Sequence, residues 1–128
     1  MRLLLDTHTF IWWDSEPSRL SRTALGLCSD PENEILLSVA SLWEMQIKNQ
    51  LGKLSLRLSL REIVTHQQET NGVAVLPISS DHVYALENLP PAHKDPFDRM
   101  LVAQATTEGV TLLSTDSIFG SYPVEVLW

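Results

Sequence analysis

The sequence contains a single cysteine, Cys28, so no disulfide bond can form within the chain. It also has no apolar run near the length of about 20 residues that a membrane-spanning helix requires. The three leucines before Asp6 are too few for the apolar part of a signal peptide. Together these absences predict a protein of a reducing compartment, and we expect it to be cytoplasmic and free of membrane attachment.

Basic residues are also scarce. Nine Lys and Arg stand against sixteen Asp and Glu, giving a formal net charge of -7. This balance argues against a protein that holds nucleic acid by bulk electrostatic attraction. It leaves open a nuclease whose positive charges are metal ions, and the absence of Cys and His at ligand spacing excludes a zinc site of the usual kind.

The remaining features predict one α/β domain over residues 1–128. The composition, 44% hydrophobic and 20% charged, is that of a compact globular chain, and there is no internal repeat or low-complexity segment. Short apolar runs without polar alternation indicate parallel strands buried on both faces. We therefore predict a three-layer α/β/α sandwich with a central parallel sheet of four to five strands, at residues 3–5, 35–37, 73–76, 110–113 and, as a fifth edge strand, 124–127.

Helices are predicted between these strands from capping residues and apolar spacing. The clearest of them cover residues 38–50, 96–108 and a stretch capped by Ser59 that runs to Asn71, whereas residues 8–14 form a short apolar segment too crowded for a single core-facing stripe. Ser18 is predicted to cap a further helix with Leu20 on its inner face. After Ser79 or Ser80, Val83 and Leu86 are expected to face inward, and the alternating leucines of residues 54–60 predict an extended, half-buried connection.

Asp6 follows the first strand directly. Ligands of open parallel sheets bind outside the carboxyl ends of the strands, so an acid at this position is a candidate site residue. The competing interpretation is that Asp6 only caps the helix that begins beside it. A site becomes the better interpretation of Asp6 only if other strands or helices bring further acids to the same edge of the sheet.

Three further acids are predicted at that edge: Asp116 after the fourth strand, and Glu44 and Asp98 about one turn inside their helices. Each has a capping alternative: Ser41-x-x-Glu44 is a capping-box pattern, Asp95-Pro96-x-Asp98 imitates one, and Asp116, like Asp6, could be an N-cap. Capping does not require four carboxylates to converge, and their mutual repulsion requires a cation. Oxygen ligands alone select Mg²⁺ or Mn²⁺. Phosphodiester hydrolysis is the chemistry that uses such a site.

The same residues resemble, in order and spacing, the four acidic motifs of PIN-domain ribonucleases, and the segment from His93 to Asp98 is similar to VapC-type toxins. The resemblance covers nearly the whole chain. It implies a Mg²⁺- or Mn²⁺-dependent endoribonuclease, usually a homodimer, that acts on RNA and is inhibited by a cognate antitoxin. It also implies that Asp6, Glu44, Asp98 and Asp116 form the catalytic, metal-binding quartet. The matching motifs are Leu3-Leu4-Leu5-Asp6-Thr7, Ser41-x-x-Glu44, Asp98 ahead of Met100 to Ala105, and Leu113-Ser114-Thr115-Asp116.

Two questions remain open within this assignment. The third motif has two acids, Asp95 and Asp98; Asp95 is predicted to cap the helix and Asp98 to face the site. Which hydroxyls line the site is also open, and the candidates are Thr7, Ser41, Ser114 and Thr115.

The sequence gives weaker indications of function for the other polar residues near the motifs. Arg99 follows Asp98 directly, so it is expected to point to a different side of the helix, where substrate phosphate or a neighbouring carboxylate is within its reach. None of the four histidines, His8, His66, His82 and His93, is predicted to be catalytic. A locally basic stretch, Lys48, Lys53, Arg57 and Arg61, is expected to be a solvated face or to touch phosphates.

Two alternative functions are weighed against the toxin ribonuclease: a solitary PIN-fold nuclease and a non-catalytic binding module on the same fold. A phospho-receiver domain is disfavoured, because Pro77-Ile78 follows the third strand where an acceptor Asp is needed. A phosphatase of the Asp-x-Asp type is disfavoured because His8 stands where the second Asp would be.

Overall fold

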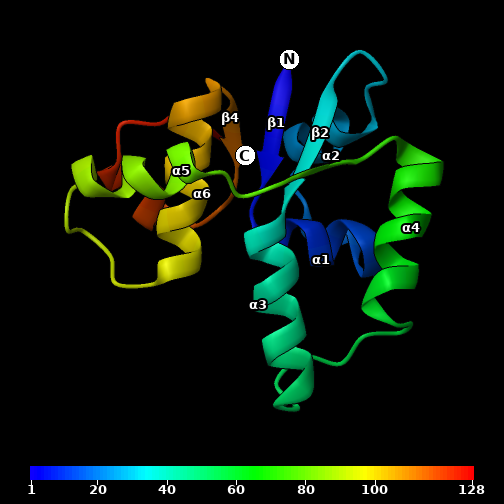
Figure 1. Cartoon of the computed structure of the whole chain (residues 1–128). Helices are drawn as coiled ribbons and strands as arrows, with labels where there is room; N and C mark the ends of the chain where they lie inside the picture. Colours follow the sequence, from blue (N-terminus) through cyan, green and yellow to red (C-terminus); the bar gives the residue numbers. More distant parts are fainter.

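A parallel five-stranded sheet forms the centre of the computed structural model, which describes residues 1–128. Its strands run in the order β3-β2-β1-β4-β5. Helices cover both faces of this sheet (Figure 1), so the predicted three-layer α/β/α sandwich is confirmed. The strands are β1 (Arg2–Leu5), β2 (Glu34–Ser38), β3 (Ala74–Leu76), β4 (Thr111–Leu113) and β5 (Val126–Leu127).

The helices divide between the two faces of the sheet. Helices α1, α2 and α4 pack on one face, α5 and α6 on the other, and α3 extends beyond the ends of the strands (Figure 1). Three short 3₁₀ helices, η1 (Pro17–Arg19), η2 (Leu86–Asn88) and η3 (Ser117–Ser121), lie between the longer elements. The α-helices are α1 (Thr7–Ser15), α2 (Arg22–Ser29), α3 (Val39–Gln50), α4 (Leu60–Asn71), α5 (Ser80–Ala85) and α6 (Pro96–Glu108).

Strand β1 is buried on both faces, as its unbroken apolar sequence predicts. Leu3 and Leu5 pack in a hydrophobic cluster with Phe10 of α1, whereas Leu4 packs in a second cluster with Leu101 of α6. All three leucines are fully buried. Alternation between two apolar layers is the reason that the buried part of the strand, Leu3 to Leu5, carries no polar residue.

The register of the sheet brings three strand ends level. Leu5 of β1 pairs with Leu37 of β2 on one side and with Leu113 of β4 on the other. Since β1 lies between strands whose connections leave in opposite directions, its carboxyl end is a topological switch point, where ligands of open α/β sheets bind. The residues that follow Leu5 and Leu113 therefore enter the same edge of the sheet.

Some local predictions are wrong. Ser21, not Ser18, caps α2 by accepting the N–H of Ala24 at 2.9 Å, because Pro17 starts the 3₁₀ helix η1 ahead of it. Val83 is exposed, and the inward residue of α5 is His82, whose ring nitrogen accepts the N–H of Ser79 in a capping box.

The connection between α3 and α4 forms no strand, although Leu54 and Leu56 are half-buried there as predicted. None of the helices has the length and hydropathy needed to cross a bilayer.

Candidate active site

Asp6 caps α1 and also contacts β4. Its Oδ1 accepts the backbone N–H of Thr9 at 2.8 Å, and its Oδ2 accepts the hydroxyl of Ser114 at 2.5 Å. The residue is only 6% exposed, so both carboxylate oxygens are fixed in direction. The predicted cap is therefore confirmed, and it uses a single oxygen, so the carboxylate still lies at the switch point, where its role as a site residue stays a prediction.

Glu44 lies on α3 and is 5% exposed. Its Oε1 accepts a hydrogen bond from the Thr7 hydroxyl at 2.7 Å, and its Oε2 accepts one from Nζ of Lys48 at 2.7 Å. The alternative that Ser41 and Glu44 form a capping box is wrong, since Ser38 caps α3 by accepting the N–H of Ala40 at 2.9 Å. Glu44 is one turn further into the helix than a capping box would place it, with its carboxylate turned toward Thr7.

Asp98 lies in the first turn of α6, after the N-cap residue Asp95. Asp95 Oδ1 accepts the backbone N–H of Phe97 at 2.8 Å, whereas Asp98 Oδ2 lies 3.0 Å from Nε2 of His93. Burial raises the pKa of the Asp98 carboxyl to about 6; the charges of Asp95 and Glu44 also raise it, and the hydrogen bond from His93 opposes them. The ionised form of Asp98 is thus disfavoured by its burial and by two nearby acids.

Asp116 follows β4 and begins η3. Its Oδ1 accepts the backbone N–H of Ile118 at 3.0 Å, and its own N–H donates to Ser114 Oγ at 3.0 Å. Unlike Asp6 and Glu44 it is exposed. The hydroxyl of Ser114 therefore contacts two of the predicted acids: it donates to the side chain of Asp6 and accepts from the backbone of Asp116.

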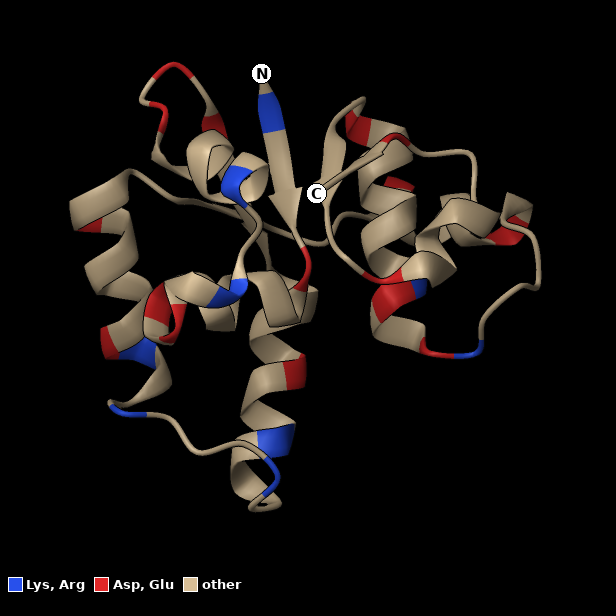
Figure 2. Cartoon of the chain, turned by 180° about the vertical axis from the view of Figure 1, so that it is seen from behind, with Lys and Arg blue, Asp and Glu red and all other residues tan.

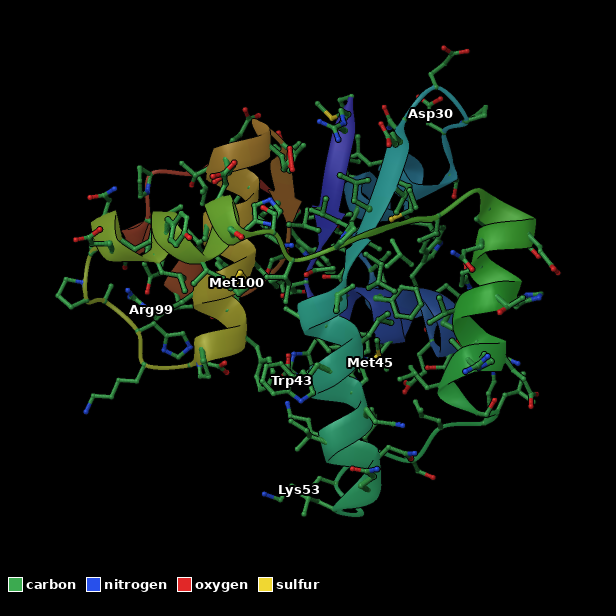
Figure 3. The ribbon with its side chains drawn as sticks, in the orientation of Figure 1. Asp30, Trp43, Met45, Lys53, Arg99 and Met100 are labelled. Carbon is green, nitrogen blue, oxygen red and sulfur yellow. The ribbon has the colours of Figure 1, made fainter.

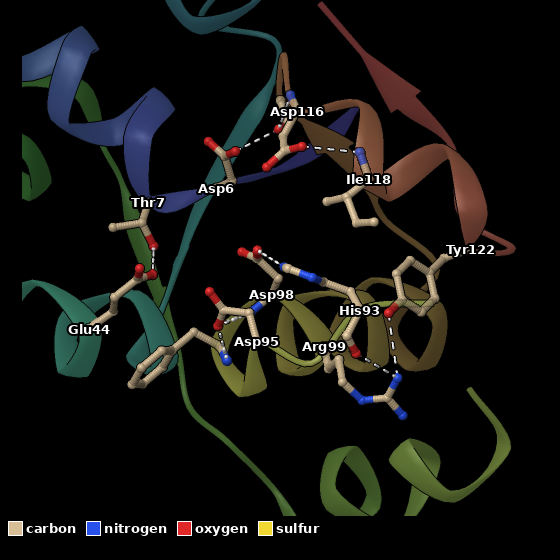
Figure 4. Close-up of polar contacts among 12 residues, drawn as sticks. Asp6, Thr7, Glu44, His93, Asp95, Asp98, Arg99, Asp116, Ile118 and Tyr122 are labelled. Atoms are coloured by element: carbon tan, nitrogen blue, oxygen red, sulfur yellow. Dashed lines mark hydrogen bonds and ion pairs between the residues drawn. The ribbon is translucent and has the colours of Figure 1, made fainter. Parts of the chain in front are cut away.

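The four predicted acids surround one space at the carboxyl edge of the sheet. In Figure 4 the carboxylates of Asp6 and Asp116 lie close to each other, that of Asp98 points toward them from α6, and Glu44 lies beside Thr7 at the border. The ligand atoms of the quartet are more widely spread than those of a closed metal site: the group whose ligand atoms lie within 4.8 Å of one another is His93, Asp95 and Asp98.

The donor set nevertheless fits a hard divalent cation. All four members offer carboxylate oxygens, the ligands that Mg²⁺ and Mn²⁺ prefer. Burial is the main cause of the raised pKa of Asp98, and repulsion from Asp95 and Glu44, which a cation would relieve, adds to it. Figure 2 shows acidic segments directly after β1, within α3 and at the start of α6.

Two of the candidate hydroxyls contact the quartet. Thr7 is buried and its hydroxyl lies 3.0 Å from Ser41 Oγ in addition to donating to Glu44. Ser114 is buried against Asp6, whereas Thr115 is exposed. Of the two hydroxyls before Asp116, the structure therefore places Ser114 toward the acids.

His93 is the residue at this site that the sequence did not reveal. It lies in the coil before α6, and its contact with Asp98 depends on that coil folding back over the first turn of the helix. Neither the periodicity of apolar residues nor the spacing of metal-ligand residues predicts a contact of this kind. The proximity of His93 to two acids in the same seven-residue segment was the only available signal.

Arg99 points to a different side of α6 from Asp98, as predicted, but its partners are backbone carbonyls and Tyr122 and not a carboxylate. Its guanidinium donates to the carbonyl oxygen of Pro90 at 2.8 Å and lies 3.4 Å from the hydroxyl of Tyr122. In Figure 4 it points away from the carboxylates, because consecutive helical residues face different sides.

The basic stretch is also partly used within the protein. Lys48 pairs with Glu44, and Arg57 pairs with the buried Asp14 at 3.1 Å. Lys53 and Arg61 are exposed. This stretch is therefore only in part the solvated face that was predicted.

Comparison with known proteins extends the assignment from the site to the chain. The sequence model of the PIN domain matches residues 3–125. The chain belongs to the PIN domain family. This match covers the first four strands, β1 from Leu3 onward, and all four acids, in agreement with the resemblance found in the motifs.

Relatives of this PIN domain match along nearly their whole length. The ribonuclease VapC22 of Mycobacterium tuberculosis is 27% identical over 118 residues, which are 89% of this chain and 86% of that protein. The fold is similar to a chain in the crystal structure of VapBC2 from Rickettsia felis bound to a promoter DNA fragment, with a TM-score of 0.75, 16% identity and coverage of 99% and 98%. A chain of a toxin–antitoxin complex from Klebsiella pneumoniae gives a TM-score of 0.60 at 18% identity, with coverage of 98% and 96%.

Proposed function

We propose that this PIN domain is a Mg²⁺- or Mn²⁺-dependent endoribonuclease, the toxin of a toxin–antitoxin pair. The observation that carries the proposal is that four carboxylates, two just after β1 and β4 and two in the first half of α3 and α6, lie around the switch point of the sheet. Likeness to a protein named as a VapC ribonuclease supports RNA as the substrate.

A nucleophilic side chain is not available as an alternative. Cys28 is buried, and burial raises the pKa of its thiol to about 12, so it is protonated at physiological pH. The buried hydroxyls of Thr7 and Ser114 contact carboxylates rather than a histidine. The site thus lacks the Ser-His or Cys-His arrangement of covalent catalysis, and hydrolysis by water fits it better.

In this proposal Asp6, Glu44, Asp98 and Asp116 hold the metal. A bound divalent ion supplies a lowered pKa for water and stabilises charge on the phosphate. The chain supplies orientation: Ser114 fixes Asp6, Thr7 fixes Glu44, and the positive N-terminus of α6 favours the ionised form of Asp98. Lys48 partly neutralises Glu44 from the opposite side of that carboxylate.

The proposed partners are a cognate antitoxin, which blocks the site, and a second copy of the chain. The Klebsiella pneumoniae structure is named as a toxin–antitoxin complex, which supports an antitoxin for this PIN domain. Trp43, 60% exposed beside Glu44, offers apolar surface next to the acids, pointing from α3 toward α6 in Figure 3.

The test is cleavage of a fluorescently labelled single-stranded RNA by the purified protein. We expect cleavage with Mg²⁺ or Mn²⁺, loss of cleavage with excess EDTA, and recovery when metal is added back. Because the net charge is -7, RNA binding without metal should be weak at physiological salt. Cleavage that persists in EDTA would exclude metal-dependent hydrolysis, and an absence of cleavage with either ion would favour a non-catalytic module.

A further inference from the structure

The coil before α6 is held in place by Arg99. The guanidinium donates to the carbonyl of Pro90 at 2.8 Å and reaches those of His93 and Leu86 at 3.5 Å. From its position in α6, Arg99 thus contacts backbone carbonyls in η2, before the coil, and at two positions within the coil. In Figure 4 the guanidinium lies behind the segment, and the imidazole of His93 projects from it toward Asp98.

The contact with His93 fixes the orientation of the Asp98 carboxylate. Nε2 of His93 lies 3.0 Å from Oδ2 of Asp98, and the two side chains are 32% and 19% exposed. Water therefore competes only in part for this hydrogen bond. With one oxygen engaged by His93, the other is left for the space that Asp6 and Asp116 also face.

We propose that His93 is a positioning residue: it donates a hydrogen bond to Asp98 and holds that carboxylate in the orientation that binds the divalent ion. This inference rests on the proposed metal-dependent function. Carboxylates that ligate metals are commonly oriented by hydrogen bonds from neighbouring groups, and losing such a partner typically weakens metal binding about 10- to 100-fold.

Direct ligation by His93 fits the geometry less well. The same Nε2 that would bind the ion is already directed at Asp98 Oδ2. Asp95, the third member of this compact group, uses Oδ1 to accept two backbone N–H groups, those of Phe97 at 2.8 Å and Asp98 at 3.3 Å. The group therefore acts as a hydrogen-bonded support for α6 and Asp98, not as a separate metal site.

The experiment is calorimetric titration of Mn²⁺ into the RNA-free protein, so that it does not depend on activity. His93→Leu removes the donor, whereas His93→Gln places an amide N–H near the position of Nε2. His66→Leu, on the exposed surface of α4, is the matched control for losing a histidine. Asp98→Asn reports whether Asp98 contributes to Mn²⁺ binding. Melting temperatures in EDTA establish that each variant is folded.

We expect His93→Leu to weaken Mn²⁺ binding by roughly 10- to 100-fold, with His93→Gln and His66→Leu close to the parent protein. Unchanged affinity in His93→Leu, alongside a loss in Asp98→Asn, would overturn this inference and leave the proposed function standing. Equal losses in His93→Leu and His93→Gln would also overturn it, because the imidazole itself would then be required. Failure of the parent protein to bind Mn²⁺ would overturn both proposals.

Discussion

One carboxylate oxygen of Asp95 accepts the backbone N–H of Asp98 at 3.3 Å, so the first of these two acids anchors the turn from which the second projects. The same oxygen accepts the N–H of Phe97, as expected for an N-cap followed by Pro96 at the first helical position. The Asp98 carboxylate makes no contact with the helix backbone and lies beside His93. The two acids of the third motif thus have different surroundings, and we expect them to have different roles.

Substitution separates these roles. Asp98→Asn should nearly abolish cleavage, because it removes a proposed metal ligand, whereas Asp95→Asn keeps a competent cap and should retain most activity. Asp95→Ala should lower the free energy of unfolding by about 1 kcal/mol. Cleavage rates with Mg²⁺ and urea denaturation measure the two effects. An inactive, stable Asp95→Asn beside an active Asp98→Asn would make Asp95 the third ligand.

The raised pKa of Asp98 predicts how the stability of the metal-free protein depends on pH. In the folded protein this pKa is about 6, above the value of 3.8 for an ordinary Asp, so the folded state binds the proton more tightly than the unfolded state does. The contribution of Asp98 to stability therefore falls as the pH rises from about 4 to 6, and the full penalty remains above pH 6.

Asp98→Asn removes this penalty and keeps an oxygen that can accept from His93. In EDTA the variant should melt at least as high as the parent protein at pH 7.5, and this advantage should shrink toward pH 4. Thermal melts at several pH values provide the measurement. A difference in melting temperature that stays constant across this range would show that the charge of Asp98 is not its cause. Mn²⁺ binding should weaken below pH 6, since protons then compete for Asp98.

The hydrogen bond from Thr7 to Glu44 gives a third prediction. Thr7→Val removes a hydroxyl donor from a carboxylate that is only 5% exposed, which typically costs about 1–3 kcal/mol of stability. Thr7→Ser keeps the hydroxyl and serves as the control. We expect the valine variant to lose both stability in urea and cleavage activity, with the serine variant near the parent protein. Equal behaviour of the two variants would mean that the hydroxyl does not orient Glu44.

Trp43 allows the proposed antitoxin contact to be measured. It is 60% exposed and packs edge-on against Phe97, with ring centroids 5.3 Å apart, whereas the other tryptophans, Trp12, Trp13 and Trp128, are half-buried. Acrylamide quenching of tryptophan fluorescence should fall when the antitoxin binds. In Trp43→Phe the change should be much smaller. Unaltered quenching in a complex shown to form by gel filtration would place the antitoxin elsewhere.

The sequence was informative where a residue's role depends on its immediate neighbours. Runs such as Leu3 to Leu5 predicted buried parallel strands, and Asp95-Pro96 predicted the start of α6, because strand burial and helix capping are set within a few residues. The positions of Asp6 and Asp116 at one edge followed from the rule that parallel strands present their carboxyl ends together.

Contacts between distant segments could not be predicted in the same way. Ser114 reaches Asp6 across 108 positions of sequence, and the direction of Arg99 is decided by a coil that folds back on its helix. His82 faces inward in place of Val83 because its ring nitrogen completes a cap, which offsets the usual preference for burying the apolar residue. These outcomes depend on packing partners that local patterns do not specify.

The strand order has a consequence for the time at which the protein becomes active. Strand β1, made first, lies between β2 and β4, so one of its edges stays unpaired until residues 111–113 have left the ribosome. The backbone N–H of Asp6 donates to Leu113, and its side chain accepts from Ser114. We therefore expect a nascent or prematurely terminated chain to have no assembled site. Nuclease activity should then appear only after residues 111–116 have been synthesised and have folded against β1.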